Sequence, residues 1–531
     1  MKKADLIILS PVIFTGFQDE TVSGMIAVVD GIIEYVGSND QFDQYKSEKT
    51  KVILVENGMV VPGFHDSHIH LYLAALYESG RFIVCKGDQS EEECVKTLFS
   101  RVSYVDKEEW ILASGWYHPI WNPRQLPSHN LLDSFFPNNP VCFLSEDCHS
   151  LWLNSKAKAI LNVIQDSEVM HDLEALLLLK EIMTQAHVHE EDCIKNYIQK
   201  LNQFGITSVC DMAIIPDEQE DFVKNACYET LLAKKELRIR IQMYPALTDS
   251  FERATMMKQK YDSGLLTFGG VKLFFDGVSS CHTALLIEPY SNPYFDNDRG
   301  SSVIDQSLAR KRVQEAQKLG YSVRTHTIGD RAVKEVTEIY SNQSENRTYY
   351  NVLEHLENID FADFDRIAHN KIVACVQPQH LIMDVKGVLE DLGAKRMHTM
   401  WPFRTMLDHH IILAFGSDAP VVNGSVLDTI ANAVTRKENN QMESFFENEC
   451  ITIEEAIIAH TYGSACAANR EHSVGYIKKG YYADLTILDR NLLLEENRNN
   501  ADEIIDTDVS YTILDGEVVY EKNLKKNTKM N

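Results

Sequence analysis

The stretch VPGFHDSHIHL, residues 61–71, sets the interpretation of the whole chain, because three histidines and one aspartate directly follow a hydrophobic run. A β-strand sends alternate side chains to opposite faces, so Asp66, His68 and His70 are expected on one face and His65 on the other. Two neighbouring imidazoles suit a divalent metal such as zinc. We therefore predict that His68 and His70 bind a metal and that His65 is a packing histidine.

Downstream of this stretch, short apolar runs alternate with helical segments, and each run ends in polar, chemically capable residues. The runs are GITSVCDM (205–212), LRIRIQMYPAL (237–247), GGVKLFFDG (269–277), YSVRTHTIGD (321–330), NVLEHLEN (351–358), KIVACVQPQH (371–380) and IILAFGSDAP (411–420). This alternation is typical of a (β/α)8 TIM-like barrel, whose active site lies at the C-terminal ends of the strands. We predict such an α/β barrel over residues 63–467, with an insertion at about 75–165 over the barrel mouth.

Both ends of the chain have the pattern of short β-strands. The segment AVVDGIIEYVG (27–37) and the segment VSYTILDGEVVY (509–520) each place an Asp-Gly turn between two apolar runs, which is a hairpin signal. The opening MKKADLIILSPVIFTG favours a first strand over a signal peptide, because Asp5 and Pro11 interrupt its apolar run. Residues 1–62 and 468–531 are therefore expected to form one small β-sandwich domain.

The composition narrows the class of protein. The 531 residues carry a net charge of −27, which argues against binding nucleic acid or an anionic membrane surface. There is no run of 18 apolar residues of the kind that spans a membrane. The 11 cysteines contain no C-x-x-C pair, a distribution that favours reduced thiols and a cytoplasmic location.

Four further strand ends strengthen the metal hypothesis. Lys272, His326, His355 and Asp418 each stand near the end of a separate apolar run. An isolated H-x-H pair is weak evidence, because such pairs occur by chance. Side chains at the C-terminal ends of several barrel strands would, however, converge on one axis. The combined pattern predicts a metal site at that end of the barrel.

The ordered motifs resemble a known family. VPGFHDSHIHL, VKLFFDGVSSCHTALLIEPY, THTIGDRAV, VLEHLENI, VQPQH and LAFGSDAPV occur in this order, followed by TIEEAIIAHTYGSACAANREHSVGYIKKGYYADLTILD. Together they resemble the amidohydrolase superfamily, and within it the YtcJ-like branch (amidohydrolase family 3) that includes N-substituted formamide deformylase. The resemblance covers nearly the whole chain.

The resemblance implies a centre of one or two divalent ions, with zinc expected. By this resemblance His68 and His70 bind one metal, His326 and His355 bind a second, and a carbamylated Lys272 bridges the two. Carbamylation would turn a cationic lysine into a carboxylate suited to two metals.

Simpler roles remain open for these residues. Lys272 could be a structural residue paired with Asp276, and His326 could be an ordinary barrel histidine. His355 could donate a hydrogen bond from behind the ligands. Without carbamylation, His68, His70, His326 and Asp418 could still hold one metal.

Asp418 is the candidate general base, with a turn aspartate as the alternative role. Metal ions lower the pKa of bound water and polarise a carbonyl group. Asp418 would take the proton of that water and pass it to the departing amine. The predicted reaction is hydrolysis of a small-molecule amide or formamide-like C–N bond by a metal-activated hydroxide.

Four residues have weaker claims to substrate binding. Trp116 and His149 resemble family positions near the pocket, although a core tryptophan and a locally bonded histidine are equally reasonable. Gln377 and His380 lie at a strand end and could contact substrate or order a loop.

Two other functions remain open. A cyclic amidine deaminase could use the same fold, but Lys272 stands where such an enzyme would need different groups. A non-catalytic regulatory or scaffold protein is the alternative from another class, and it would have no need of a carboxylate beside the metal. The expected partner is a small-molecule amide, and a homodimer is left open as the assembly.

Overall fold

The computed structural model describes residues 2–17, 20–102, 106–163, 168–185, 190–218, 220–341, 348–437, 443–497 and 500–522. Within these ranges no helix has the length and apolar character needed to cross a membrane.

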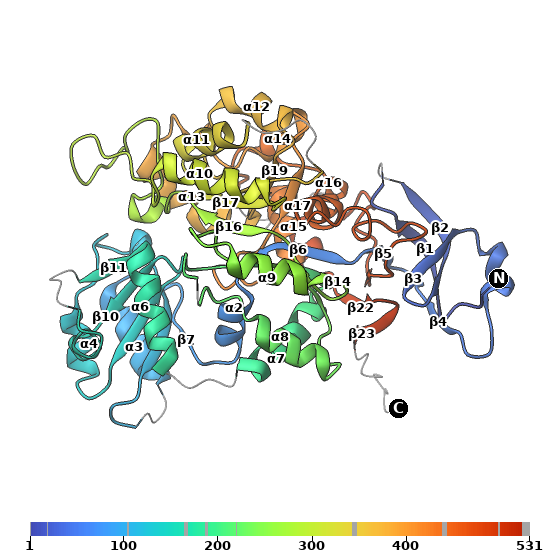
Figure 1. The fold of residues 1–531 in the computed structure, drawn as a ribbon, viewed down its shortest axis with the longest axis horizontal. Coiled ribbons are helices and arrows are strands. Elements are labelled where there is room, and N and C mark those ends of the chain that lie inside the picture. The colour runs from blue at the N-terminus through green and yellow to red at the C-terminus, as the bar shows by residue number, and fades with distance from the viewer. Residues whose placement is uncertain are drawn as a thin grey trace.

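Eight parallel strands form a closed barrel in the middle of the molecule (Figure 1). They are β6 (Phe64–Ile69), β12 (Ile206–Met212), β13 (Arg240–Tyr244), β16 (Val271–Phe274), β17 (Val323–Thr327), β18 (Val352–His355), β19 (Val373–Val376) and β20 (Leu413–Phe415). Hydrogen-bonded ladders join β6–β12–β13 and β16–β17–β18–β19–β20. Two junctions complete the ring: a parallel bridge between Ala246 and Lys272, and a 2.7 Å bond from the Asp418 amide to the His68 carbonyl. The predicted TIM-like barrel is confirmed.

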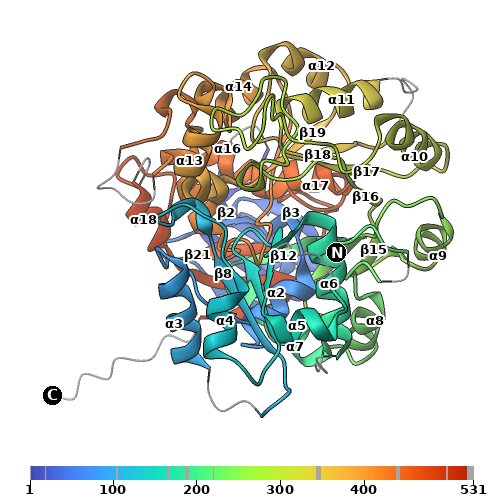
Figure 2. The same cartoon turned by 90° about the vertical axis from the view of Figure 1, so that its left-hand side faces the viewer.

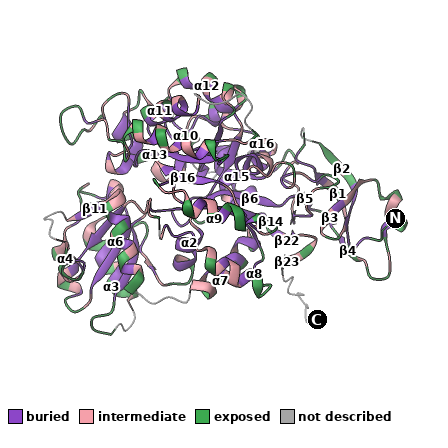
Figure 3. Ribbon diagram, viewed as in Figure 1, coloured by how far each residue is buried: buried purple, intermediate pink, exposed green. Residues whose placement is uncertain are grey.

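Helices cover the outside of the barrel, and their apolar faces pack against the strands (Figure 3). They include α7 (Glu190–Gln203), α8 (Asn225–Ala233), α9 (Glu252–Lys260), α10 (Gln306–Lys318), α11 (Asp330–Ser341), α12 (Phe364–His369), α13 (Pro378–Leu392), α14 (Phe403–Asp408), α15 (Val426–Thr435) and α16 (Ile453–Ile458). Local sequence defines several helix starts, as in α16, where Thr452 and Glu455 form a capping box. The barrel strands are almost wholly buried because helices enclose them.

One eight-stranded sheet contains strands from both chain ends. It comprises β1 (Leu6–Phe14), β2 (Thr21–Val29), β3 (Ile32–Gly37), β4 (Lys51–Leu54), β5 (Met59–Pro62), β21 (Leu485–Leu488), β22 (Val509–Leu514) and β23 (Glu517–Glu521). The register of β1 shifts between Ser10 and Ile13, so its first part pairs with β4 and its last part with β5. Ile8 and Ile26 from one end and Leu485 from the other share one buried core. The sheet lies on the right in Figure 1.

A separate five-stranded sheet interrupts the barrel after its first strand. Its strands are β7 (Ile83–Val84), β8 (Ile111–Trp116), β9 (Val141–Ser145), β10 (Ser150–Leu153) and β11 (Val169–His171), with α3 (Glu91–Arg101), α4 (His129–Phe135) and α5 (Ser155–Ile160) packed around them. The buried helix α2 (Leu71–Glu78) precedes this sheet, and α6 (Asp172–Gln185) follows it. Figure 2, viewed from this side, shows the insertion in front of part of the barrel.

Candidate metal centre

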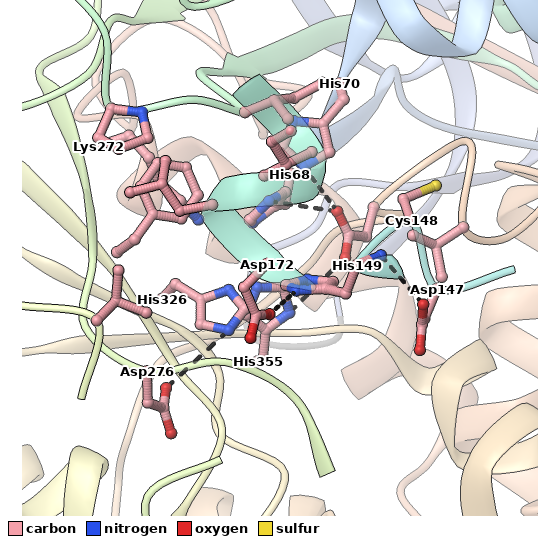
Figure 4. A pocket seen from close by; sticks show the side chains of 18 of the residues that line it. His68, His70, Asp147, Cys148, His149, Asp172, Lys272, Asp276, His326 and His355 are labelled. Carbon is pink, nitrogen blue, oxygen red and sulfur yellow. Dashed lines mark hydrogen bonds and ion pairs between the residues drawn. The ribbon is translucent and has the colours of Figure 1, made fainter. Parts of the chain in front are cut away.

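The predicted metal-binding side chains meet in one pocket at the C-terminal ends of the barrel strands (Figure 4). The pocket is lined by His68, His70, Lys272, His326, His355 and Asp418, and from the insertion and α6 by Asp147, Cys148, His149 and Asp172. The imidazole ring centroids of His68 and His355 are 5.0 Å apart, and those of His326 and His355 are 4.4 Å apart. Residues from opposite ends of the barrel sequence, such as His68 and Asp418, therefore share one pocket.

Strand β6 does not keep the strict alternation that the sequence predicts. Its pairing with β12 shifts between the pair Asp66–Val209 and the pair Ile69–Asp211, which inserts one extra residue on β6. The bulge changes where the side chains point beyond it. His68 and His70 line the pocket, whereas the Asp66 carboxylate accepts bonds from the Ser417 amide at 2.9 Å and hydroxyl at 2.6 Å. The prediction that Asp66 shares the face of His68 and His70 was wrong for this reason.

His65 is a packing histidine in this structure. It is 2% exposed, and its Nε2 lies 3.4 Å from the Cys210 sulfur. Burial lowers the pKa of His65 to about 3, so the ring is neutral at physiological pH.

In each candidate histidine ligand, one ring nitrogen bonds to a residue outside the ligand set, which directs the other ring nitrogen toward the pocket. His68 Nδ1 is 2.6 Å from Glu354 and His70 Nδ1 is 3.1 Å from the Met212 carbonyl, so both expose Nε2. His355 Nδ1 is 3.0 Å from Gln377 Oε1 and likewise exposes Nε2, whereas His326 uses Nε2 toward the Gly277 carbonyl at 3.2 Å and exposes Nδ1. Such partners fix the tautomer and orientation of metal-binding histidines.

The ring nitrogens and the carboxylate that face the pocket are suited to binding a cation. His68 Nε2 and Asp418 Oδ1 are buried, and no described residue outside this set of candidate ligands bonds to either atom. One ligand atom each from His68, His355 and Asp418 lies within 4.8 Å of the others. Burial lowers the pKa of His68 to about 4 and those of His326 and His355 well below the ordinary value, so neutral imidazoles offer lone pairs. A set of neutral nitrogens around a buried carboxylate suits a divalent metal.

Asp418 is held at the centre of this set. Its Oδ1 is 3.1 Å from His70 Nε2 and 3.5 Å from His68 Nε2, and its backbone has a φ of 56°. Burial opposes ionisation, but the surrounding His68, His70 and His355 hold the pKa of Asp418 well below its ordinary value. The carboxylate is therefore charged at neutral pH.

Lys272 lines the pocket and is 1% exposed. Burial lowers the pKa of its ammonium group to about 8, which brings the neutral amine within reach near physiological pH. The alternative pairing with Asp276 has little support, because the Asp276 carboxylate accepts the backbone amides of Leu285, Ile328 and Gly329 at 2.9–3.0 Å. The lysine amine is thus available for chemistry at the site.

The predicted substrate-binding residues fall in three different environments. Trp116 is 1% exposed in the core of the insertion, where its indole donates to the Phe143 carbonyl at 2.8 Å, so it packs the scaffold and does not face the pocket. His149 lines the pocket and its Nδ1 is 2.8 Å from Asp172. Gln377 orients His355, and His380 lines an adjoining lobe of the cavity.

The sequence reasoning missed a buried ion pair beneath the metal centre. Glu354 is wholly buried, bonds to His68 and forms an ion pair with Arg324, whose guanidinium also donates to Ser67 Oγ at 3.0 Å. The available signal was a charged residue inside each of two apolar strand runs, VRTHT and VLEH. A charge in a buried strand needs a buried partner.

Comparisons with known proteins agree with this geometry. A sequence model of the amidohydrolase family matches residues 51–520. The chain is 26% identical over 536 residues to a Bacillus subtilis protein named as the amidohydrolase YtcJ, covering 96% of this chain and 98% of the relative. It is 22% identical over 556 residues to N-substituted formamide deformylase from Arthrobacter pascens, covering 98% of each. A solved structure of an uncharacterized metal-dependent hydrolase from Pyrococcus horikoshii has a TM-score of 0.74 and 23% identity, covering 92% of this chain and 99% of that one, which shows a shared fold.

Proposed function

Because this chain belongs to the amidohydrolase family and is a metal-dependent hydrolase of carbon–nitrogen bonds other than peptide bonds, we propose that it hydrolyses a small-molecule amide or formamide. The observation that carries this proposal is the buried set of His68, His355 and Asp418, whose candidate ligand atoms lie within 4.8 Å of one another beside a pocket. The name of the Arthrobacter pascens relative supports N-substituted formamides as the first substrates to try.

We propose zinc as the metal, held by His68 and His70 and, where two ions bind, by His326 and His355 as well. When bound, such an ion lowers the pKa of a coordinated water and polarises the substrate carbonyl. The neutral imidazoles and the carboxylate of Asp418 supply the donor set. A carbamate on Lys272 would add a carboxylate between two ions, and its formation needs the neutral amine that the lowered pKa makes accessible.

Asp418 is proposed to act as the general base. It would accept the proton of the attacking water and deliver it to the nitrogen of the departing amine. Its position between His68 and His70 aims the carboxylate at the centre of the pocket. Gln377 and Glu354 hold His355 and His68 in the required orientation, which keeps the ligands fixed while the proton moves.

The variant Asp418→Asn tests this role. We expect kcat on an N-formyl or N-acyl amide to fall by about 10²–10⁴-fold, the usual contribution of a general base. Metal content measured on the same sample separates loss of the base from loss of the ion. Asp365→Asn is the matched control, because the Asp365 side chain is 92% exposed and pairs with His409 at the protein surface. Unchanged hydrolysis by Asp418→Asn would contradict the mechanism.

Carbamylation of Lys272 has a direct spectroscopic test. Protein equilibrated with ¹³C-labelled bicarbonate and metal should show one carbamate carbon resonance that disappears in Lys272→Met. The same resonance persisting in the variant would place the modification elsewhere, and its absence from the metal-loaded wild type would leave Lys272 as an unmodified residue.

A further inference from the structure

The cavity continues beyond the metal centre into a second lobe of different chemistry. Both lobes share Asp147, His149, His326, His355, Asp418 and Val421. Beyond these residues the first lobe has a polar part, lined by His68, His70, Asp172, Lys272 and Asp276, and an apolar part that includes Leu73, Leu173, Leu176 and Ile214. The second is lined by Tyr117, Glu357, His380, Asp384 and Asp391. A molecule lying across the candidate metal centre would therefore have an apolar surface available in the first lobe and the carboxyl groups of Glu357, Asp384 and Asp391 in the second.

The carboxylates of the second lobe are only partly neutralised by the chain. Asp391 forms an ion pair with Arg124 at 2.8 Å. Glu357 and Asp384 have weaker partners, since Asp384 accepts the Tyr117 hydroxyl at 2.7 Å and Glu357 lies 3.6 Å from His380 Nδ1. None of the described residues that line this lobe is lysine or arginine. Even an imidazolium at His380 would balance only one of these two carboxylates.

His380 provides a second and independent observation. The residue is 5% exposed, and its Nε2 is buried with no hydrogen-bond partner in the described part of the chain. Nδ1 lies 3.6 Å from Glu357 Oε1 and Nε2 lies 3.8 Å from Asp418 Oδ2. Burial opposes protonation of the ring, but Glu357 and Asp418 raise the pKa of His380 above its ordinary value. A buried ring nitrogen with no hydrogen-bond partner is costly unless a bound group supplies one.

We infer that this lobe binds an ammonium group of the substrate, held by Glu357, Asp384 and His380. An ammonium offers three N–H donors and one positive charge, which match the carboxylates of Glu357 and Asp384 and, in its neutral form, the ring nitrogen of His380. The inference rests on the proposed function and narrows its substrate to an amide with an apolar group on one side of the scissile bond and a cationic nitrogen on the other.

The charge state of Asp384 agrees with this assignment. Burial and the neighbouring Glu357 raise the pKa of Asp384 to about 8. A buried carboxyl that keeps its proton near neutral pH indicates that the protein itself supplies too little positive charge to this lobe. A substrate cation would supply the missing charge.

The test compares matched amides on the metal-loaded enzyme. N-formyl-1,4-diaminobutane and N-formylpentylamine have similar shape, but only the first carries an ammonium group. A second pair, N-pentyl-5-aminopentanamide and N-pentylhexanamide, places the ammonium on the acyl half. We expect kcat/KM to be roughly 10-fold or more higher for the ammonium member of at least one pair. Equal kcat/KM values within both pairs would overturn the inference while leaving amide hydrolysis intact.

Variants locate the effect. Asp384→Asn should reduce the preference for the ammonium compound to within about threefold, because an amide cannot ionise opposite the bound ammonium as the carboxyl group can. Asp408→Asn is the matched control, since the Asp408 side chain is 65% exposed and pairs with Arg404 away from the lobe. A preference that survives Asp384→Asn would overturn the assignment of the lobe, and the wild-type comparison stands even where a variant does not fold.

A binding measurement separates this inference from the proposed function. Calorimetric titration of the metal-loaded enzyme with pentylammonium and with 1-pentanol needs no hydrolysis. Tighter binding of pentylammonium supports the lobe even where no amide is cleaved, and equal binding overturns it. The set Glu357, His380 and Asp384 could also hold a metal ion. Binding of an additional zinc ion that Asp384→Asn abolishes and pentylammonium does not displace would therefore replace the ammonium assignment with a metal site.

Discussion

Glu354 should stabilise the metal centre by orienting His68, and the variant Glu354→Gln tests this role. The carboxylate is wholly buried and accepts His68 Nδ1 at 2.6 Å on one oxygen while its other oxygen pairs with Arg324. Burial alone would raise the pKa of Glu354, but Arg324 and His68 hold it well below its ordinary value. The amide variant keeps the shape of the side chain and removes its charge.

Two separate losses follow from this change. His68 loses the carboxylate that fixes its tautomer, and loss of such a partner lowers metal affinity by about 10–100-fold. Arg324, which is wholly buried, loses its counter-charge. Removing one member of a buried ion pair costs about 3–5 kcal/mol of unfolding free energy. Arg324 keeps its bond to Ser67 Oγ and its position 4.9 Å from the Tyr244 ring, neither of which supplies a negative charge.

The assay measures both quantities on the same proteins. Metal affinity comes from competition with a chromophoric chelator on folded protein, and stability comes from urea unfolding of the metal-free form. The double variant Arg324→Gln with Glu354→Gln also removes the buried guanidinium that Glu354→Gln leaves without a counter-charge. It should therefore regain part of the lost free energy of unfolding, while its metal affinity stays low. Glu335→Gln is the control, because Glu335 pairs at 2.8 Å with Arg331, which is 48% exposed, and such pairs contribute about 0.3–0.5 kcal/mol. Metal affinity within twofold of wild type in Glu354→Gln would refute the reasoning.

Two further predictions concern packing and pH. In Gly416→Ala the new Cβ would lie 2.5 Å from the His68 Cβ, so we expect the free energy of unfolding to fall by about 1–3 kcal/mol and metal retention to weaken. In Gly387→Ala the nearest contact is 3.5 Å from the new Cβ, so this variant should be neutral or stabilising by up to about 1 kcal/mol. Urea unfolding of both variants decides this, and equal effects would show that the junction of β20 and β6 tolerates the methyl group. Burial raises the pKa of Asp211 to about 7 from 3.8, although the Tyr228 hydroxyl donates to it at 2.7 Å. Between about pH 4 and pH 7 the unfolded chain has lost this proton and the folded chain keeps it, so the stability of wild type relative to Asp211→Asn should fall by about 4 kcal/mol as the pH rises through that window. If the free energies of unfolding of wild type and Asp211→Asn change in parallel with pH, the raised pKa of Asp211 is contradicted.

Local sequence patterns were sufficient to predict the barrel and the residues gathered at its centre. Each apolar run from GITSVCDM (205–212) to IILAFGSDAP (411–420) became a barrel strand, because buried parallel strands require continuous apolar residues. The strand-end side chains of His326, His355 and Asp418 then had to meet, since parallel barrel strands all end on the same side.

The tertiary structure decided how those residues are held and which of them face the cavity. Because of the bulge in β6, the side chains of Asp66 and His68 point in different directions. Trp116 packs in the core of the insertion and does not line the pocket. Strand periodicity describes one segment at a time and contains no information on which distant side chain will become its partner.

The sequence by itself therefore determined the barrel class and the donor types at its strand ends, because both follow from local hydrophobicity and from the shared polarity of parallel strands. Two features follow only from the tertiary structure. Glu354 bonds to His68, which lies 286 positions away in the sequence, and Glu357, His380 and Asp384 line one lobe of the cavity. The physical reason is that a buried charge is stable only beside a specific partner, and the choice of that partner is made when the strands and the insertion come together.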